Sequence, residues 1–156
     1  MSLRIYIAYG TASDQVTALR LQALGAVNGL TIYVPPAFTR EDPSGQPDPQ
    51  SELRIWEAEI VLGVVTVGLS EACWRELDIG KRLGKKTMVI AEPVFAAQLE
   101  PSFPGSVLMM NSANPAEAEA GLVQFLENAN LKQDTAKALL ALGTIALGLL
   151  LFSPQD

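Results

Sequence analysis

The apolar residues of this chain gather into five short runs, which are separated by segments with a helical spacing of apolar and polar positions. The runs cover residues 4–8, 30–34, 60–66, 87–91 and 106–110. Each run has the length of a β-strand, and the one at 60–66 is almost entirely apolar, as in a strand covered on both faces. Five strands that alternate with helices predict an α/β fold with a five-stranded parallel sheet wrapped on both sides.

We expect the flavodoxin-like strand order 2-1-3-4-5 for this sheet, and such sheets bind ligands at the carboxyl ends of the first and third strands. Residues 9–13 and 67–70 follow those two strands. A ligand crevice is therefore expected where these two segments meet.

The segment after the central strand predicts one helix, which begins after Ser70 as N-cap and ends near Leu83, before Gly84. At about 100° per residue, small and apolar residues fall on one stripe, and two acid–base pairs fall on the opposite side. Glu76 belongs to neither set. Its neighbours three and four residues away are Ala72, Cys73, Ile79 and Gly80.

Glu76 has two interpretations. Its carboxylate emerges among small and apolar groups without a local cation, and such desolvation raises a carboxyl pKa and suits the group to catalysis. The alternative is a half-buried glutamate that accepts hydrogen bonds from a neighbouring loop. Because its helix begins at the expected crevice, where free N–H groups also suit a phosphate, we favour the catalytic interpretation.

Three more helices are expected. The first begins near Ser13 or Asp14, the second covers residues 50–58, and the third begins at Asn114. The core face of the first helix is expected to consist of Val16, Leu19, Ala23 and Ala26.

Two proline-containing segments are expected to be irregular. Residues 92–104 are interrupted by three prolines, and residues 35–49 contain five. A loop as long as the second is uncommon inside a compact domain, so it is either a restricted connector or a lid over the site.

The composition of the chain argues against several classes of function. The formal net charge of −6 and the lack of a basic tract argue against a nucleic-acid partner. The chain has no histidine, so enzymatic chemistry would rest on carboxylates, and no metal site is expected. The single cysteine, Cys73, predicts a packed thiol in a reducing compartment.

The C-terminal segment 138–152 is apolar except for Thr144. As a helix it would measure about 23 Å, which is shorter than a hydrocarbon core of about 30 Å. Since it lacks a polar face, it must be buried in lipid or in protein. We favour a membrane anchor that holds the main domain in the cytoplasm, because Lys132 and Lys137 precede the segment. The alternative is a helix that packs in an oligomer or against a partner protein.

The chain is thus expected to consist of an α/β domain at residues 1–130 and a C-terminal hydrophobic helix within residues 131–156. Thr144 and Gly148 form a small-residue pair that would allow close packing with another copy.

The α/β domain resembles the Toll/interleukin-1 receptor (TIR) family over residues 3–130, most specifically around Glu76. Residues 69–77, which read Leu-Ser-Glu-Ala-Cys-Trp-Arg-Glu-Leu, are similar to the family's Ser followed by Cys-x-x-Glu-Leu. The Gly-Lys-Lys sequence at 84–86, before an apolar strand, is similar to the family's Gly-Lys. Residues 5–9 resemble its first strand, and residues 35–49 occupy the place of its loop after the second strand.

This resemblance implies a TIR-like fold and, for a bacterial-type NAD-cleaving member, NAD as a substrate with no separate cofactor. Active members cleave the bond between nicotinamide and ribose, and their essential glutamate matches Glu76. The resemblance assigns Glu76 to the ribose hydroxyls and to stabilisation of an oxocarbenium-like transition state.

Six further positions are candidate substrate contacts. The family's first-loop contacts fall on Tyr9 and Gly10, its lid includes Phe38 and Arg40, and Ser70 lies at the crevice. Trp74 would stack on a base, although packing is the commoner role for such a tryptophan. The candidate substrate-binding residues are therefore Tyr9, Gly10, Phe38, Arg40, Ser70 and Trp74. The chain differs from many active members in having Ala72 where they have tryptophan, and Ala8 where the usual residue is serine.

The leading hypothesis is a membrane-tethered NAD glycohydrolase that yields ADP-ribose or a cyclic form. It would act as a signalling or defence effector when copies assemble into an oligomer or filament. The first alternative is a non-enzymatic TIR scaffold that recruits a partner protein. The second is a nucleoside deoxyribosyltransferase-like enzyme, which shares the fold and a helix-borne glutamate, but residues 67–72 lack the aspartate common in that family.

Overall fold

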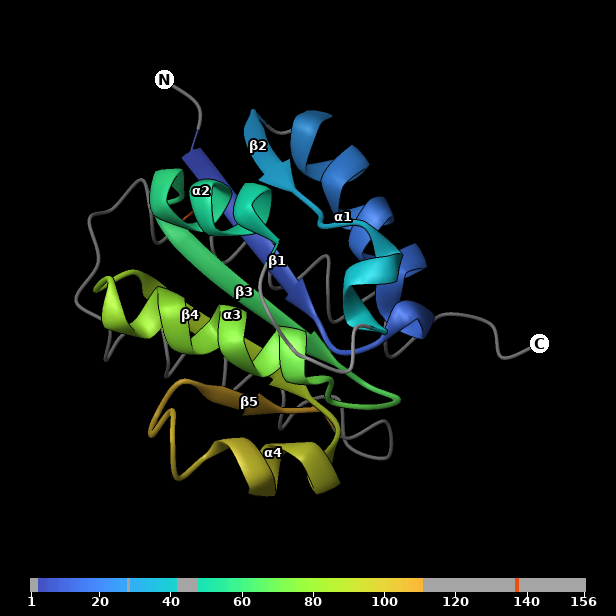
Figure 1. Cartoon of the computed structure of the whole chain (residues 1–156), viewed down its shortest axis with the longest axis vertical. Coiled ribbons are helices and arrows are strands. Elements are labelled where there is room, and N and C mark those ends of the chain that lie inside the picture. The colour runs from blue at the N-terminus through green and yellow to red at the C-terminus, as the bar shows by residue number, and fades with distance from the viewer. Residues whose placement is uncertain (1–2, 28, 42–47, 111–136, 138–156) are drawn as a thin grey trace.

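A computed structural model describes residues 3–27, 29–41, 48–110 and 137. Five parallel strands form one sheet in the order β2-β1-β3-β4-β5, which confirms the predicted α/β fold and strand order (Figure 1). The strands are β1 Leu3–Tyr9, β2 Leu30–Tyr33, β3 Ile60–Val65, β4 Lys86–Ala91 and β5 Val107–Met109.

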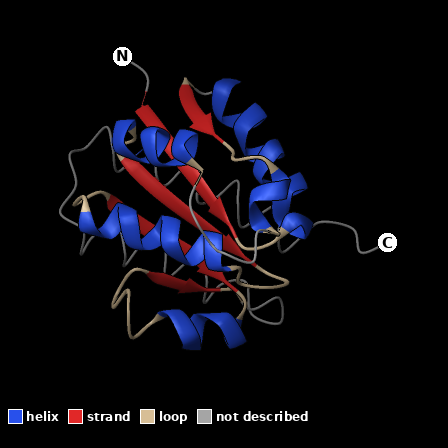
Figure 2. Cartoon of the chain, viewed as in Figure 1, coloured by secondary structure: helices blue, strands red, loops and turns tan. Residues whose placement is uncertain are grey.

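Helices cover both faces of this sheet (Figure 2). The 3₁₀ and α-helices are η1 Ala12–Asp14, α1 Gln15–Val27, η2 Ala37–Arg40, α2 Pro49–Glu57, α3 Glu71–Arg82 and α4 Pro93–Leu99. One core cluster joins α1 to alternate strand residues such as Ile7 and Leu62. The other joins α2, α3 and α4 to the intervening residues, such as Ala8 and Val61. Both alternating faces of the inner strands are therefore buried, which explains their continuous apolar sequence.

The predicted core face of α1 is wrong. Val16 is 59% exposed and Leu19 is 44% exposed, and Ala23 and Ala26 also face solvent. The helix is apolar around most of its circumference, so the helical spacing of its apolar residues could not show which side is buried. The sheet selects the side with Ala18, Leu21 and Gly25, where a Cβ on the glycine would lie 2.3 Å from Ile32 Cδ1. The small residue allows the helix to lie close to β2.

A second correction concerns residues 92–104, which contain the helix α4. Pro93 stands in the first turn of α4, where proline is compatible with a helix because its missing N–H would have no partner there. Ala96 and Leu99 are buried against the sheet. The proline was a helix start rather than an interruption.

Two expected elements lie outside the described residues, namely the helix from Asn114 and the hydrophobic segment 138–152. Within the described residues, no helix is both long and apolar enough to cross a bilayer. The membrane anchor therefore remains a prediction.

Candidate functional site

Helix α3 carries Glu76 into the interior of the molecule. Ser70 caps the helix, and its Oγ accepts a hydrogen bond from the backbone N–H of Cys73 at 3.2 Å. Cys73, Leu77 and Gly80 pack on the sheet, and a Cβ on Gly80 would lie 2.8 Å from Val61 Cγ2. Because α3 lies this close to β3, Glu76 beside the stripe is only 1% exposed.

The carboxylate of Glu76 is paired with the guanidinium of Arg40 from η2. Arg40 Nη1 donates to Glu76 Oε1 at 2.7 Å, and Nη2 donates to Oε2. Both side chains are buried, with exposed fractions of 0% and 1%. The expectation that Glu76 has no nearby cation is therefore wrong, because the cation comes from a segment 36 residues earlier. A paired fork geometry of this kind gives strong and directional hydrogen bonds.

The rest of the Arg40 guanidinium is also fully engaged. Nη1 donates to the carbonyl oxygen of Tyr9 at 3.0 Å, and Nε and Nη2 donate to Thr39 Oγ1 at 3.1 and 3.0 Å. Together with the two contacts to Glu76, these bonds use all of the N–H donors that a guanidinium carries. Arg40 also lies over the Tyr9 ring, with Cζ 4.7 Å from the ring centroid. The groups around Arg40 thus satisfy its guanidinium completely.

Burial dominates the protonation equilibria at this site. It raises the pKa of Glu76 above its ordinary value, although Arg40 opposes the shift. Burial alone would lower the pKa of Arg40, but the hydrogen bonds and charge of Glu76 raise it above its ordinary value. Burial raises the pKa of Tyr9 to about 12, so the Tyr9 hydroxyl stays protonated and donates to the carbonyl oxygen of Pro35 at 2.6 Å.

Two further polar groups are buried near the site, Tyr6 close to Glu76 and Ser51 close to Tyr6, and the sequence did not indicate them. Tyr6 on β1 and Ser51 on α2 are both fully buried. Within the described part of the chain, neither hydroxyl has a hydrogen bond of good geometry. Burial raises the pKa of Tyr6 well above its ordinary value, and the charge of Glu76 adds to the shift, which indicates that the two groups are close. The only sequence signal for Tyr6 was its polar tip within the short apolar run at residues 5–8.

The two segments of the predicted crevice pack directly on each other. A Cβ on Gly10 would lie 2.0 Å from the carbonyl oxygen of Gly68, and the Gly10 carbonyl accepts from the Ser70 N–H at 3.1 Å. Asp14 is buried and accepts hydrogen bonds from Thr66, at 3.1 Å from its backbone N–H and also from its hydroxyl. Asp14 therefore ties the two loops together instead of capping α1.

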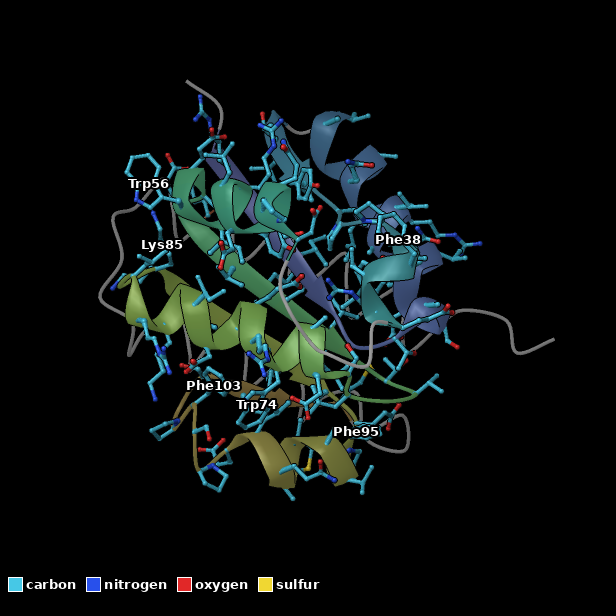
Figure 3. The ribbon with its side chains drawn as sticks, in the orientation of Figure 1. Phe38, Trp56, Trp74, Lys85, Phe95 and Phe103 are labelled. Carbon is cyan, nitrogen blue, oxygen red and sulfur yellow. The ribbon has the colours of Figure 1, made fainter. Side chains whose placement is uncertain are left out.

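The structure brings together three of the predicted site residues, namely Tyr9, Arg40 and Glu76. Phe38 is on the same turn as Arg40 but is 70% exposed. Trp74 is half-buried on another side of α3, edge to face with Phe103 at a centroid distance of 5.7 Å (Figure 3). Phe38 and Trp74 therefore remain predicted substrate contacts, and the structure does not group them with Tyr9, Arg40 and Glu76.

A cavity of about 430 Å³ lies elsewhere, beside the amino end of β1, the strand β2 and the end of α2, and its lining residues include Arg4, Tyr33, Arg54 and Glu57. Neither Glu76 nor Arg40 lines it. Among the described residues, no group of three or more acidic, cysteine or histidine side chains could hold a metal ion.

No protein-family model matches the chain, and no curated protein matches it. Among solved structures, the chain is similar to the TIR domains of the activated Roq1 resistosome, which directly recognizes the pathogen effector XopQ. That match covers 93% of this chain and 84% of the other chain, with 14% sequence identity and a TM-score of 0.46. A likeness at this level establishes neither a family nor an activity.

Proposed function

We propose that this protein is a TIR-type NAD glycohydrolase that cleaves NAD into nicotinamide and ADP-ribose or its cyclic form. The observation that carries the proposal is the buried carboxylate of Glu76, which faces a planar cation beside the carboxyl end of β1. The Cys-x-x-Glu-Leu sequence on α3 supports the same assignment.

The chemistry needs a carboxylate in a poorly hydrated position. When the bond between nicotinamide and ribose breaks, its electron pair leaves with nicotinamide, which becomes neutral, and positive charge develops on the ribose. Water then adds to the ribose carbon and releases a proton. A fixed negative group stabilises that charge most effectively where water is excluded, as it is around Glu76, which is 1% exposed.

The other parts of the proposal concern binding and location. Tyr9 and Gly10 would contact the nicotinamide ribose, and the start of α3 at Ser70 would face the phosphates. Phe38 and Trp74 would contact the rings of NAD. We further propose a cytoplasmic domain that self-associates and is anchored to a membrane through residues 138–152. Alkaline carbonate extraction of the full-length chain tests the anchor, because an anchored chain stays with the membrane pellet.

A time course of NAD loss with purified full-length protein tests the catalytic role. Glu76→Gln should reduce the rate by about 100-fold or more, the range seen when one preorganised electrostatic contact is removed. Glu71→Gln is the matched control, since Glu71 is an exposed acid on the same helix. Equal NAD loss in the wild type and Glu76→Gln would reject the role of Glu76.

A non-enzymatic TIR scaffold is the second candidate function. The observation that favours it is that both oxygens of Glu76 are held by Arg40, as in a purely structural ion pair. This function predicts no NAD loss under any assembly condition, while Phe38→Ala, which changes an exposed side chain, abolishes association.

A further inference from the structure

We infer that the pocket in front of Glu76 binds a flat organic cation, and that Arg40 is its built-in occupant, which blocks NAD until η2 moves away. This inference rests on the proposed NAD glycohydrolase function and concerns the regulation of the same site. It assigns Arg40 an inhibitory role in place of a substrate contact on a lid.

The groups that hold Arg40 are those that recognise a planar cation. The guanidinium faces the Glu76 carboxylate, lies over the Tyr9 ring at 4.7 Å and donates to the Tyr9 carbonyl at 3.0 Å. A carboxylate and an aromatic face together attract a flat cation through charge and through the ring quadrupole. The pyridinium ring of NAD is also flat and positively charged, so it matches the same surroundings.

Arg40 and the substrate exclude each other. The fork of Arg40 takes both oxygens of Glu76, and its side chain is fully buried in the space before the carboxylate. A second cation at this place would meet both a steric clash and the repulsion of a like charge in a poorly hydrated pocket. The site is therefore closed to NAD in this arrangement.

The segment that carries Arg40 can be displaced at small cost in backbone hydrogen bonds. Helix η2 is four residues long. The backbone bonds of its turn run from the N–H of Thr39 to the Pro36 carbonyl, at 3.1 Å, and from the N–H of Glu41 to the Phe38 carbonyl, at 3.2 Å. The Arg40 side chain attaches the turn to Glu76 and to the Tyr9 carbonyl, and the Tyr9 hydroxyl also holds the carbonyl of Pro35, just before the turn. Loss of the ion pair would release the turn without disturbing the sheet.

Glu76 would keep a hydrogen-bonding partner after the release of Arg40. The hydroxyl of Tyr6 is buried close to the Glu76 carboxylate, and Ser51 is buried close to Tyr6. Both groups have a proton to donate. The Tyr6 hydroxyl would position the Glu76 carboxylate in the open state.

The test compares NAD loss by full-length wild type, Arg40→Ala and the double variant Arg40→Ala/Glu76→Gln. If the open state is a minor one of about 0.1–10%, release of Arg40 should raise the rate about 10- to 1,000-fold. The double variant should return to background. Arg82→Ala is the matched control, because Arg82 makes an exposed pair with Asp78 at 2.9 Å, and its rate should equal that of the wild type.

Guanidinium chloride at non-denaturing concentration gives a second readout. It should inhibit Arg40→Ala by refilling the pocket, whereas potassium chloride at equal ionic strength should not. Thr39→Val covers the case in which Arg40→Ala does not fold. It removes the hydroxyl that orients Nε and Nη2 but leaves the charge pair, so a smaller rise in rate is expected.

The outcomes separate the two proposals. If the wild type and Arg40→Ala cleave NAD equally fast and both need Glu76, the inhibitory role of Arg40 is overturned and the proposed function stands. If no variant cleaves NAD, the proposed function fails and the inference fails with it. If Arg40→Ala is unfolded and Thr39→Val is no faster than the wild type, the inhibitory role is again overturned.

Discussion

The ion pair between Arg40 and Glu76 gives a prediction about stability that does not depend on any activity. The exposed fractions of these side chains are 0% and 1%, so removal of one partner leaves a buried charge without compensation. Breaking such a pair costs about 3–5 kcal/mol, a large part of the roughly 5–15 kcal/mol that stabilises a domain. Replacing both partners with apolar side chains of similar volume removes both charges and is nearly neutral or stabilising.

We therefore expect Arg40→Met to be strongly destabilised and Arg40→Met/Glu76→Leu to be more stable than Arg40→Met. Urea unfolding of the full-length proteins, followed by circular dichroism, measures this difference. With a slope of about 2 kcal/mol per molar urea, the midpoint of Arg40→Met should fall by about 2 M.

The control for this experiment is Arg82→Met. Arg82 and Asp78 are 78% and 36% exposed, so the loss of their pair should cost about 1 kcal/mol or less. If Arg40→Met lowers the free energy of unfolding no more than Arg82→Met does, the buried pair described here does not exist in solution.

Three further predictions follow from the packing around the site. Gly10→Ala should lower the melting temperature, because its Cβ would lie 2.0 Å from the Gly68 carbonyl oxygen, and overpacking of this kind costs about 1–3 kcal/mol. Ser70→Ala should cost about 1 kcal/mol in urea unfolding, since it removes the cap on the Cys73 N–H, whereas Ser70→Asp should restore most of that loss. Burial raises the pKa of the Cys73 thiol well above its ordinary value, so a thiol reagent should label the native chain only at the rate of unfolding, and fast labelling without denaturant would contradict the structure.

The three inner strands could be predicted from the sequence because they are buried on both faces. Ile60–Val65, for example, has no exposed residue, and its apolar run marks the strand directly. The parallel direction of the strands followed from their alternation with helices, since parallel neighbours need crossover connections. The order 2-1-3-4-5 was expected only as that of a flavodoxin-like sheet. The predicted strand boundaries differ from the observed ones by at most one residue.

The faces of the helices were harder to predict. In α3 the charges of Asp78 and Arg82 mark the exposed side, and the buried stripe with Cys73 and Leu77 was predicted correctly. In α1 the exposed Val16 and Leu19 are as apolar as the buried Leu21, so no contrast marks the buried side. The sheet decides the orientation there, through the close contact between Gly25 and Ile32.

The partner of Glu76 could have been identified by elimination. A buried carboxylate needs a counter-charge, because the effective cost of burying an ion is several kcal/mol. The neighbours of Glu76 on α3 supply none, so the cation must come from another segment. The proline-containing segment at 35–49 was expected to be either a connector or a lid over the site, and Arg40 is its only cation.

The same electrostatics underlie both the resting pair and the proposed catalysis. A carboxylate that stabilises a cation on the ribose must be poorly hydrated, and a poorly hydrated carboxylate is unstable alone. The resting protein must then neutralise Glu76 by protonation or by a cation of its own. Arg40 supplies that cation in a geometry that uses both carboxylate oxygens. A glutamate adapted to the proposed reaction therefore needs either a proton or a cation when the substrate is absent, and the inhibitory role that we infer for Arg40 follows from the same burial.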